Sequence, residues 1–428
     1  MDSQSMSRVW YFTLAWLMVG FLACTPDHPS DPSPNILLIV ADDLGYEQLG
    51  SYGGLGVKTP NLDAMADRGV RFSRAYTSGV CTPSRMSLYT SLYPSRHGYT
   101  TVLPVHLGTQ RAVDFQAMPT YAQQLQQKGY HTAVTGKWQL ATLEYHPVHI
   151  RSAGYDSWCV WQIWRDSAKT RRYWEATYNQ DGEIRTDIAD RFGPDVMAEY
   201  VIDQMVRASA AGKPFAIQHN MVLPHTPIIE TPTDRALGRE PSLPQMVTYL
   251  DRIVGRLLAA VDSLGIAEHT YVLFVGDNGT ESKDIRQTEA GPVVGGKWDL
   301  NDAGMHVPLL ALVPGQADGR VDPSLVDMVD LFPTLCELAG IDLADQKIDG
   351  QSFVAPLLGT GVGSRAFVSG AIKDEVVVFD GAWRLSHPSM ELMDCRNLPQ
   401  EVVADSTEPA AQEARQRLEK LLLDMLQP

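Results

Sequence analysis

The sequence contains few cysteines and no cysteine spacing that is typical of a zinc site or a disulfide framework. Only five of its 428 residues are cysteines, and none of them forms a Cys-x-x-Cys pair. If Cys24 and Cys81 serve other purposes, the remaining three can form one bridge at most. The stability of the fold must therefore come from a hydrophobic core, which a chain of this length with 44% hydrophobic residues can build.

Basic residues are scarce relative to acidic ones. The 35 lysines and arginines are outnumbered by 51 aspartates and glutamates, which gives a net charge of −16. This balance excludes general binding to nucleic acid or to anionic lipid, because both partners need a basic surface. A negatively charged substrate would have to be held by a local cluster of cations.

The N-terminal apolar run is too short to span a bilayer. Residues 9–23 fall short of the about 20 residues that a spanning helix needs, and they fit the hydrophobic region of a signal peptide. The run ends in Phe21-Leu-Ala-Cys24, which resembles a bacterial lipoprotein lipobox except that Phe21 replaces an aliphatic residue. We expect a signal peptide and lipobox at 1–24 and a flexible tether at 25–34. The protein is then a periplasmic or outer-membrane lipoprotein of a bacterium, held to the membrane only by its lipid; the alternative is a secreted soluble protein.

Behind the tether, apolar segments of strand length alternate with helical patterns. The alternation is typical of an α/β fold with a large mixed, mostly parallel sheet sandwiched by helices. The expected strands are 35–45, 131–137, 213–221, 270–279 and 307–315, and the expected helices are 61–67, 84–92, 119–128, 195–208, 246–264 and 326–338.

A glycine-rich stretch at residues 357–364 marks the expected domain boundary. It separates a large catalytic domain at 35–360 from a C-terminal α+β subdomain at 361–428. In the subdomain, short antiparallel strands are expected at 366–372, 376–387 and 391–394, followed by a terminal helix at about 409–426.

Residues 155–178 depart from the alternation. This segment combines aromatic and basic side chains: Trp158, Trp161, Trp164, Arg165, Lys169, Arg171, Arg172, Tyr173 and Trp174. We interpret it as an excursion over the active-site face that could stack sugar rings and bind a further anionic group. A locally packed aromatic cluster is the alternative.

Two expected strands end in pairs of oxygen-bearing side chains. Asp42 and Asp43 follow one strand, and Asp277 and Asn278 follow another. Ligands of open α/β sheets bind beyond the carboxyl ends of the strands. Four hard oxygen donors at one rim favour Ca²⁺ or Mg²⁺ over zinc.

One motif points to a family. Residues 78–98 include Cys81-Thr-Pro-Ser-Arg85, a helical pattern and Thr90-Ser91. This resembles the signature of the sulfatases, Cys-x-Pro-Ser-Arg before a helix and a Thr-Gly turn. The resemblance extends to the first strand, Gly136-Lys137-Trp138, the Leu-Pro-His-Thr-Pro around His225, the Gly-Asp-Asn-Gly at 276–279, the glycine-rich segment from Gly295 and residues 391–401. The chain is identified as a member of the formylglycine-dependent type I sulfatases of the alkaline-phosphatase-like superfamily, similar to arylsulfatases.

The resemblance implies a sulfuric ester hydrolase that splits a sulfate ester into an alcohol and inorganic sulfate. Cys81 would be converted to formylglycine by a formylglycine-generating or anaerobic sulfatase-maturating enzyme. The hydrated aldehyde serves better than a thiol, because one hydroxyl attacks sulfur and the other later expels sulfate. A divalent cation, usually calcium with magnesium as the alternative, would be held by Asp42, Asp43, Asp277, Asn278 and the converted Cys81.

Other roles carry over by the same resemblance. Arg85 would stabilise the diol oxyanion. Lys137 and Lys297 would bind sulfate oxygens, and His225 would protonate the leaving oxygen.

The sequence departs from the family pattern at two places. Gln139 stands where a histidine is usual, and glutamine cannot act as the base that helps to expel sulfate. Substitute bases nearby in the sequence are His131, His146 and His149. The second departure is the segment 302–306, where Glu-Gly-Gly-x-Arg is usual; we interpret it as structural variation behind the site.

The substrate class is the least determined part of this prediction. A sulfated saccharide is expected, and a small aryl sulfate is the other option. Two further alternatives are a phosphonate monoester or phosphodiester hydrolase on the same scaffold, and a lipoprotein that binds sulfated glycans with impaired turnover because of Gln139.

Overall fold

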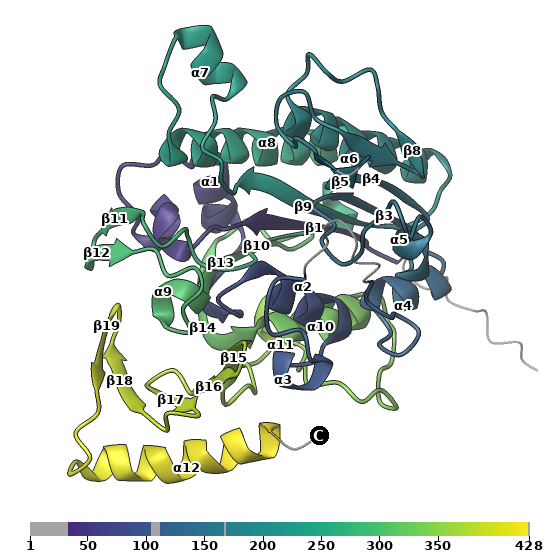
Figure 1. Ribbon diagram of the computed structural model, residues 1–428. Helices are drawn as coiled ribbons and strands as arrows, with labels where there is room; N and C mark the ends of the chain where they lie inside the picture. Colours follow the sequence, from purple (N-terminus) through teal and green to yellow (C-terminus); the bar gives the residue numbers. More distant parts are fainter. Residues whose placement is uncertain (1–32, 104–111, 167, 427–428) are drawn as a thin grey trace, which may run out of the picture. The chain divides into compact units, whose positions relative to one another are not determined.

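The computed structural model describes residues 33–103, 112–166 and 168–426 (Figure 1). The expected signal peptide, Cys24 and the tether up to Pro32 lie outside these residues. From Ser33 onward the described chain forms one compact unit. None of the helices in the described ranges has both the length and the apolar content to span a bilayer.

A ten-stranded mixed sheet forms the centre of the fold. Five neighbouring strands in its middle, β10, β1, β9, β3 and β4, run parallel, whereas β13 is antiparallel to both β10 and β2. The strands, in spatial order, are β14 (Arg320–Asp327), β2 (Val70–Tyr76), β13 (His306–Leu312), β10 (Thr270–Gly276), β1 (Asn35–Asp42), β9 (Phe215–Pro224), β3 (His131–Gly136), β4 (Ser157–Trp161), β7 (Tyr178–Gln180) and β8 (Glu183–Ile184).

The central strands form because their sequences are apolar on both faces. Every residue of β9 is buried, and so is every residue of β1 after Asn35. A strand that is buried on both sides needs helices above and below it, as in other parallel sheets. The expected mixed, mostly parallel sheet is therefore confirmed.

Helices cover both faces of this sheet (Figure 1). One layer contains α1 (Pro60–Arg68), α6 (Gly193–Ala210) and α8 (Leu243–Ser263), and the other contains α2 (Cys81–Thr90), α4 (Tyr121–Gln127) and α10 (Leu331–Leu338). The apolar stripe expected in the long helix is buried as predicted, at Leu250, Ile253, Val254, Leu257, Leu258 and Val261. Short helices complete the fold: α3 (Pro94–His97), α5 (His149–Ser152), α7 (Pro232–Leu237), α9 (Asp302–Met305) and α11 (Val354–Leu358).

A second sheet of five antiparallel strands lies at the C-terminal end of the chain. It consists of β15 (Val368–Ile372), β16 (Glu375–Phe379), β17 (Trp383–His387), β18 (Leu392–Asn397) and β19 (Gln400–Val403), and α12 (Pro409–Met425) packs on it. The strands predicted at 366–372 and 391–394 correspond to β15 and β18, and the terminal helix is present. The segment predicted as one strand at 376–387 instead forms two antiparallel strands, β16 and β17, and β19 is an additional strand. Two further ribbons are β5 (Trp164–Arg165) with β6 (Ala168–Lys169), and β11 (Ile285–Thr288) with β12 (Gly291–Val294).

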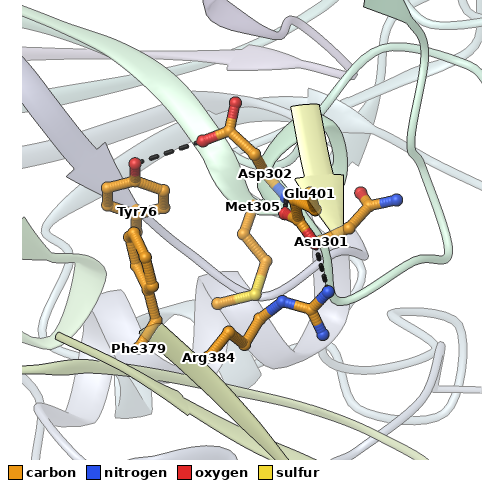
Figure 2. Close-up of a pocket in the computed structure, with 7 residues that line it drawn as sticks. All are labelled: Tyr76, Asn301, Asp302, Met305, Phe379, Arg384 and Glu401. Atoms are coloured by element: carbon orange, nitrogen blue, oxygen red, sulfur yellow. Dashed lines mark hydrogen bonds and ion pairs between the residues drawn. The ribbon is translucent and has the colours of Figure 1, made fainter. Parts of the chain in front are cut away.

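Polar contacts join the second sheet to the first (Figure 2). The Glu401 carboxylate accepts a hydrogen bond from the backbone N–H of Asp302 at 2.6 Å and an ion pair from Arg384. The Asp302 carboxylate in turn accepts from the Tyr76 hydroxyl at 3.1 Å. The segment 302–306, which departs from the family pattern, thus lies at this junction.

Two further expectations about secondary structure are wrong. Residues 157–161 do not leave the sheet, because they form β4, which pairs with β3; the excursion begins only at Gln162. The helix expected at 326–338 begins at Leu331, since residues up to Asp327 belong to β14 and Met328–Asp330 form a 3-10 turn. The four cysteines in the described part of the chain are buried and unpaired.

Candidate active site

The predicted site residues gather where four neighbouring parallel strands end. Asp277 follows β10, Asp42 ends β1, His225 follows β9 and Lys137 follows β3. These strands are adjacent in the sheet and point the same way. Side chains that are far apart in the sequence therefore meet at one rim, as expected for an open α/β sheet.

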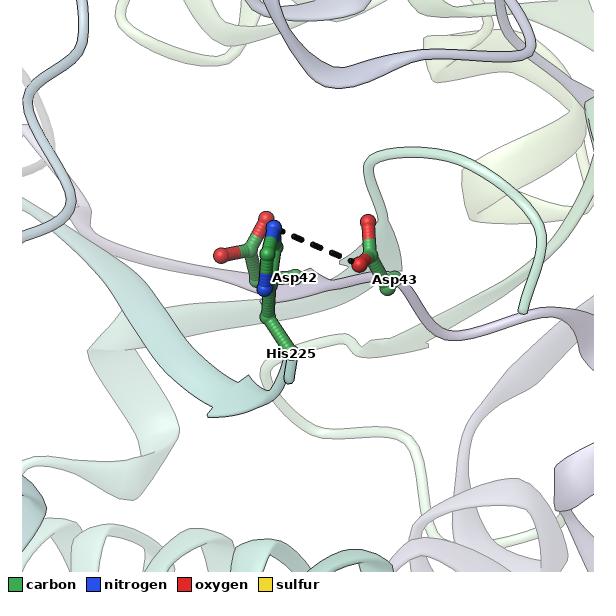
Figure 3. A group of neighbouring side chains, drawn as sticks. All are labelled: Asp42, Asp43 and His225. Atoms are coloured by element: carbon green, nitrogen blue, oxygen red, sulfur yellow. Dashed lines mark ion pairs between the residues drawn. The ribbon is translucent and has the colours of Figure 1, made fainter. Parts of the chain in front are cut away.

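Asp42, Asp43 and His225 form a compact group of ligand atoms (Figure 3). One such atom from each residue lies within 4.8 Å of the others, and His225 Nε2 is 3.5 Å from Asp43 Oδ2. Asp43 has a φ of 64°, a left-handed conformation that aspartate tolerates better than most residues. The sharp turn lets two consecutive carboxylates reach the same site.

Asp277 and Asn278 complete the predicted oxygen set. The backbone N–H of Asp43 donates to Asp277 Oδ1 at 3.0 Å, and Asn278 Nδ2 donates to Asp43 Oδ1 at 2.9 Å. Two buried oxygens of the set, Asp42 Oδ2 and Asn278 Oδ1, have no hydrogen-bond partner. A buried hydrogen-bond acceptor that has no partner lowers the stability of the fold. Because both are hard oxygen donors, the residues present fit a divalent cation such as calcium.

Three buried cations lie among the carboxylates. Lys137 Nζ is 2.6 Å from Asp42 Oδ1, and Lys297 Nζ pairs with Asp43. Arg85 binds Asp277 Oδ2 with both Nε at 2.9 Å and Nη2 at 2.7 Å. The structure thus brings together every cation that the sequence assigned to the site.

The charges at the rim shift one another's pKa values. Burial alone would raise the pKa of Asp42, but the nearby cations, Lys137 above all, hold it well below its ordinary value. Burial raises the pKa of Asp277, and Arg85 opposes this shift. Burial would lower the pKa of Lys297, yet Asp43 raises it overall. The three carboxylates and three cations cancel in formal charge, so a bound divalent cation would make the rim positive.

Cys81 is the first residue of α2, a helix whose ten residues are all buried. Its thiol donates a hydrogen bond to Gln139 Oε1 at 3.4 Å. Burial raises the pKa of this thiol, and Lys137 opposes the shift. The unmodified cysteine is therefore a poor nucleophile, since the thiolate is the reactive form.

His225 connects the rim to the excursion of residues 162–178. Its Nε2 atom lies 3.4 Å from Lys297 Nζ, and its Nδ1 atom lies 2.9 Å from Arg172 Nη2. Burial lowers the pKa of His225 to about 4, and Asp42 partly opposes this. The sequence placed Arg172 in the cationic segment but gave no signal that it contacts His225.

Two of the three suggested substitute bases lie elsewhere. His149 accepts from the Trp138 indole N–H at 3.1 Å and bonds the Val113 carbonyl at 2.9 Å, so both ring nitrogens are occupied. His131 starts β3, whose opposite end carries Lys137, and six strand residues separate these ends by roughly 17–20 Å. His149 is therefore a packing histidine and His131 lies at the far end of its strand, so the structure supports neither as the substitute base, whereas His146 stays a prediction.

Comparison with known proteins gives one consistent family. The Sulfatase family model matches residues 34–341. Arylsulfatase A of Bos taurus is 32% identical over 397 residues, which cover 87% of this chain and 76% of that protein. N-acetylgalactosamine-6-sulfatase of Canis lupus familiaris is 30% identical over 372 residues, which cover 82% of this chain and 70% of that protein.

Solved structures share the fold at lower sequence identity. One belongs to a Bacteroides thetaiotaomicron locus for metabolism of multiple glycosaminoglycans; it has a TM-score of 0.76 and 22% identity, and covers 92% of this chain and 99% of that one. The phosphonate monoester hydrolase of Agrobacterium radiobacter has a TM-score of 0.65 and 19% identity, and covers 92% of this chain and 95% of that one.

Proposed function

The chain belongs to the sulfatase family, whose members are sulfuric ester hydrolases, and we propose that it cleaves the sulfate ester of a saccharide with the help of a converted Cys81 and a bound calcium ion. One observation carries this proposal. Cys81 opens a fully buried helix beside a rim where three carboxylates and three cations form ion pairs and two buried oxygens lack partners.

The cation would be held by Asp42, Asp43, Asp277 and Asn278, with residue 81 beside them. When bound, the cation supplies positive charge for the sulfate group, and formylglycine supplies a hydrated aldehyde as the nucleophile. Calcium suits the set because all four protein ligands are oxygens. Arg85 holds Asp277 in place through two hydrogen bonds and so orients one ligand of the set.

The remaining residues bind and orient the ester. Lys137, which pairs with Asp42, and Lys297, which pairs with Asp43, offer ammonium hydrogens to sulfate oxygens. His225 Nε2 faces Lys297 and Asp43, so we assign to this atom the proton that the leaving oxygen receives. Gln139 can donate its amide hydrogens to an oxygen at residue 81 but cannot remove a proton.

A sulfated saccharide is favoured over a small aryl sulfate by the pocket next to His225. This cavity has a volume of about 660 Å³ and is lined by Trp161, Tyr173 and Trp174, a size and composition suited to a sugar ring. One relative is an N-acetylgalactosamine-6-sulfatase, and one structural neighbour comes from a glycosaminoglycan locus.

The test combines kinetics with mass spectrometry. Protein made in cells with a formylglycine-generating enzyme should release inorganic sulfate from 4-nitrophenyl sulfate and faster from sulfated saccharides. The peptide that contains Cys81 should carry the aldehyde. A higher kcat/KM for an aryl phosphonate would favour the phosphonate monoester hydrolase, which shares the fold. An unmodified Cys81 without turnover would favour a glycan-binding lipoprotein.

We also propose that the protein is exported and anchored by lipid at Cys24, a residue outside the described part of the chain. The support is the apolar run at 9–23 and the lipobox-like ending at Cys24. Cys24→Ser should move the protein from the membrane fraction to the soluble fraction. An unchanged distribution would favour plain secretion.

A further inference from the structure

The 660 Å³ pocket lies beside the catalytic rim and shares one wall with it. That wall is His225, whose Nε2 atom faces Lys297 and whose Nδ1 atom faces Arg172. A substrate whose ester group sits at the rim can therefore extend past His225 into this pocket.

Among the described residues, two cations of the pocket, Lys169 and Arg172, make no ion pair with a carboxylate. Both lie over the same indole ring, with Arg172 Cζ at 4.7 Å and Lys169 Nζ at 6.0 Å from the centroid of Trp161. Within the described residues, neither cation makes an ion pair, whereas the neighbouring Arg171 pairs with Glu175. Two cations close to one ring repel each other unless an anion joins them.

Arg172 is not a solvent-exposed side chain that water neutralises. It is 8% exposed, and its Nε atom has no hydrogen-bond partner. Its Nη2 atom donates to the Thr226 carbonyl and approaches His225, so the guanidinium is fixed in the pocket wall. The charge of Arg172 acts on Asp42 from a distance, but no carboxylate of the described residues pairs with it directly. Buried charges are normally paired, so this guanidinium is free to bind an anion.

The same excess of positive charge affects the pKa of Lys169. Burial lowers its pKa first, and the nearby cations Arg172 and Lys137 lower it further. Lys169 lines the same pocket as Arg172 and His225. A bound anion would relieve this repulsion.

We propose that this pocket binds a sugar ring that carries a second anionic group, in addition to the sulfate ester that is cleaved. This proposal rests on the proposed sulfatase function. The second group is a carboxylate or a further sulfate, which share the negative oxygens that Lys169 and Arg172 bind. The aromatic walls hold the ring, while the two cations select dianionic over monoanionic saccharides.

The experiment compares kcat/KM for three matched substrates: a monosulfated neutral sugar, the corresponding sulfated uronic acid, and the corresponding disulfated sugar. The wild type should prefer one or both dianionic substrates, and the preferred one identifies the second group. Lys169→Met should reduce the ratio of dianionic to monoanionic kcat/KM by about 10- to 100-fold, as expected for a lost hydrogen bond to a charged group. High salt should reduce the same ratio in the wild type.

Lys213→Met is the matched control, because Lys213 is exposed in the turn after α6 and its loss changes the net charge equally. This variant should keep the wild-type ratio. The second anion site is overturned if kcat/KM is equal for all three substrates. It is also overturned if Lys169→Met and Lys213→Met change the ratio of dianionic to monoanionic kcat/KM equally. Neither result would contradict the sulfatase function.

Absence of turnover on every sulfate ester would instead overturn the proposed function. In that case, calorimetric titration of the protein with the three saccharides measures their affinities for the pocket without any turnover. Tighter binding of a dianionic sugar, weakened by Lys169→Met only, would support the pocket. Equal or absent binding would overturn it.

Discussion

The Cys81 thiol donates its hydrogen bond to the amide oxygen of Gln139, at 3.4 Å. The residue that would act as a base on the oxygen at position 81 is thus replaced by one that only forms hydrogen bonds. His149, ten residues further along the chain, is held by Trp138 and Val113 and cannot substitute.

Gln139→His should therefore raise kcat for sulfate ester hydrolysis. The loss of a general base costs about 10²- to 10⁴-fold in the step that it assists, so release of sulfate should limit the wild-type rate. Stopped-flow measurement should show a burst of alcohol followed by slow turnover in the wild type and a smaller burst in Gln139→His. A wild type without a burst, together with an unchanged kcat in the variant, would mean that another group, with His146 as the remaining suggestion, supplies the base.

Asp277→Asn should abolish the effect of calcium on both activity and thermal stability. The change keeps the shape of the side chain but removes one of the three carboxylates of the predicted cation site. That site also contains the two oxygens without a hydrogen-bond partner, Asp42 Oδ2 and Asn278 Oδ1. In the wild type, calcium at 100 times its Kd should stabilise the fold by about 2.7 kcal/mol and raise Tm. Differential scanning calorimetry with calcium and with chelator measures this difference.

Asp251→Asn is a control for the metal prediction. Asp251 is also buried, but it accepts hydrogen bonds from the backbone of Asn61 and Leu62, away from the rim. Its loss should lower Tm without removing the calcium-dependent shift. If chelator left Tm and turnover of the wild type unaltered, the calcium assignment would be wrong.

The stability of the protein should fall as the pH drops below 6.5, with His149 as one cause. Burial lowers the pKa of His149 from 6.5 to about 4, and the bond to Val113 partly opposes this. The unfolded chain therefore takes up a proton on this ring before the folded chain does, so the contribution of His149 to the free energy of unfolding decreases between pH 6.5 and about 4 and is constant below. One such group contributes at most about 1.4 kcal/mol per pH unit.

His149→Gln should make the decline between pH 6.5 and 4 shallower, although it lowers Tm at neutral pH through the lost bonds to Trp138 and Val113. A Tm series against pH measures both effects. An identical slope in wild type and variant would show that His149 is protonated equally in the folded and unfolded chains.

Arg365→Met should destabilise the protein by about 3–5 kcal/mol, because it leaves a buried carboxylate without its partner. Arg365 binds Asp330 with two nitrogens and also contacts the Tyr93 hydroxyl. Chemical denaturation measures the loss. The exposed Arg396, which pairs with Asp394 and Glu408, is the comparison, and Arg396→Met should change stability little. A similar result for both arginines would contradict the prediction.

Strands β1, β3, β9, β10 and β13 could be predicted because each is a largely apolar run. The other strands of the large sheet could not, and β2 and β14 show why. In β2 the buried residues Val70 and Phe72 alternate with Arg71 and Ser73, and this alternation lacks the continuous apolar signal. β14 contains Pro323, which is tolerated because the strand lies at the edge of the sheet.

The rim residues could likewise be predicted, since strand ends and family motifs place Asp42, Asp277 and Lys137 at known positions along the chain. The contact between Arg172 and His225 could not be. It joins an irregular loop to the residue after β9, and neither spacing nor periodicity fixes where such a loop lies.

The position of β1 in the middle of the sheet has a consequence for synthesis of the protein. Both of its neighbours, β9 and β10, are encoded far downstream and begin at Phe215 and Thr270. During translation, the N-terminal third of the chain thus emerges well before its pairing partners, and long-range pairing of this kind is slow. In the finished fold Cys81 is only 3% exposed, too little for another enzyme to enclose it. We therefore expect any enzyme that converts Cys81 to act on the growing or still unfolded chain.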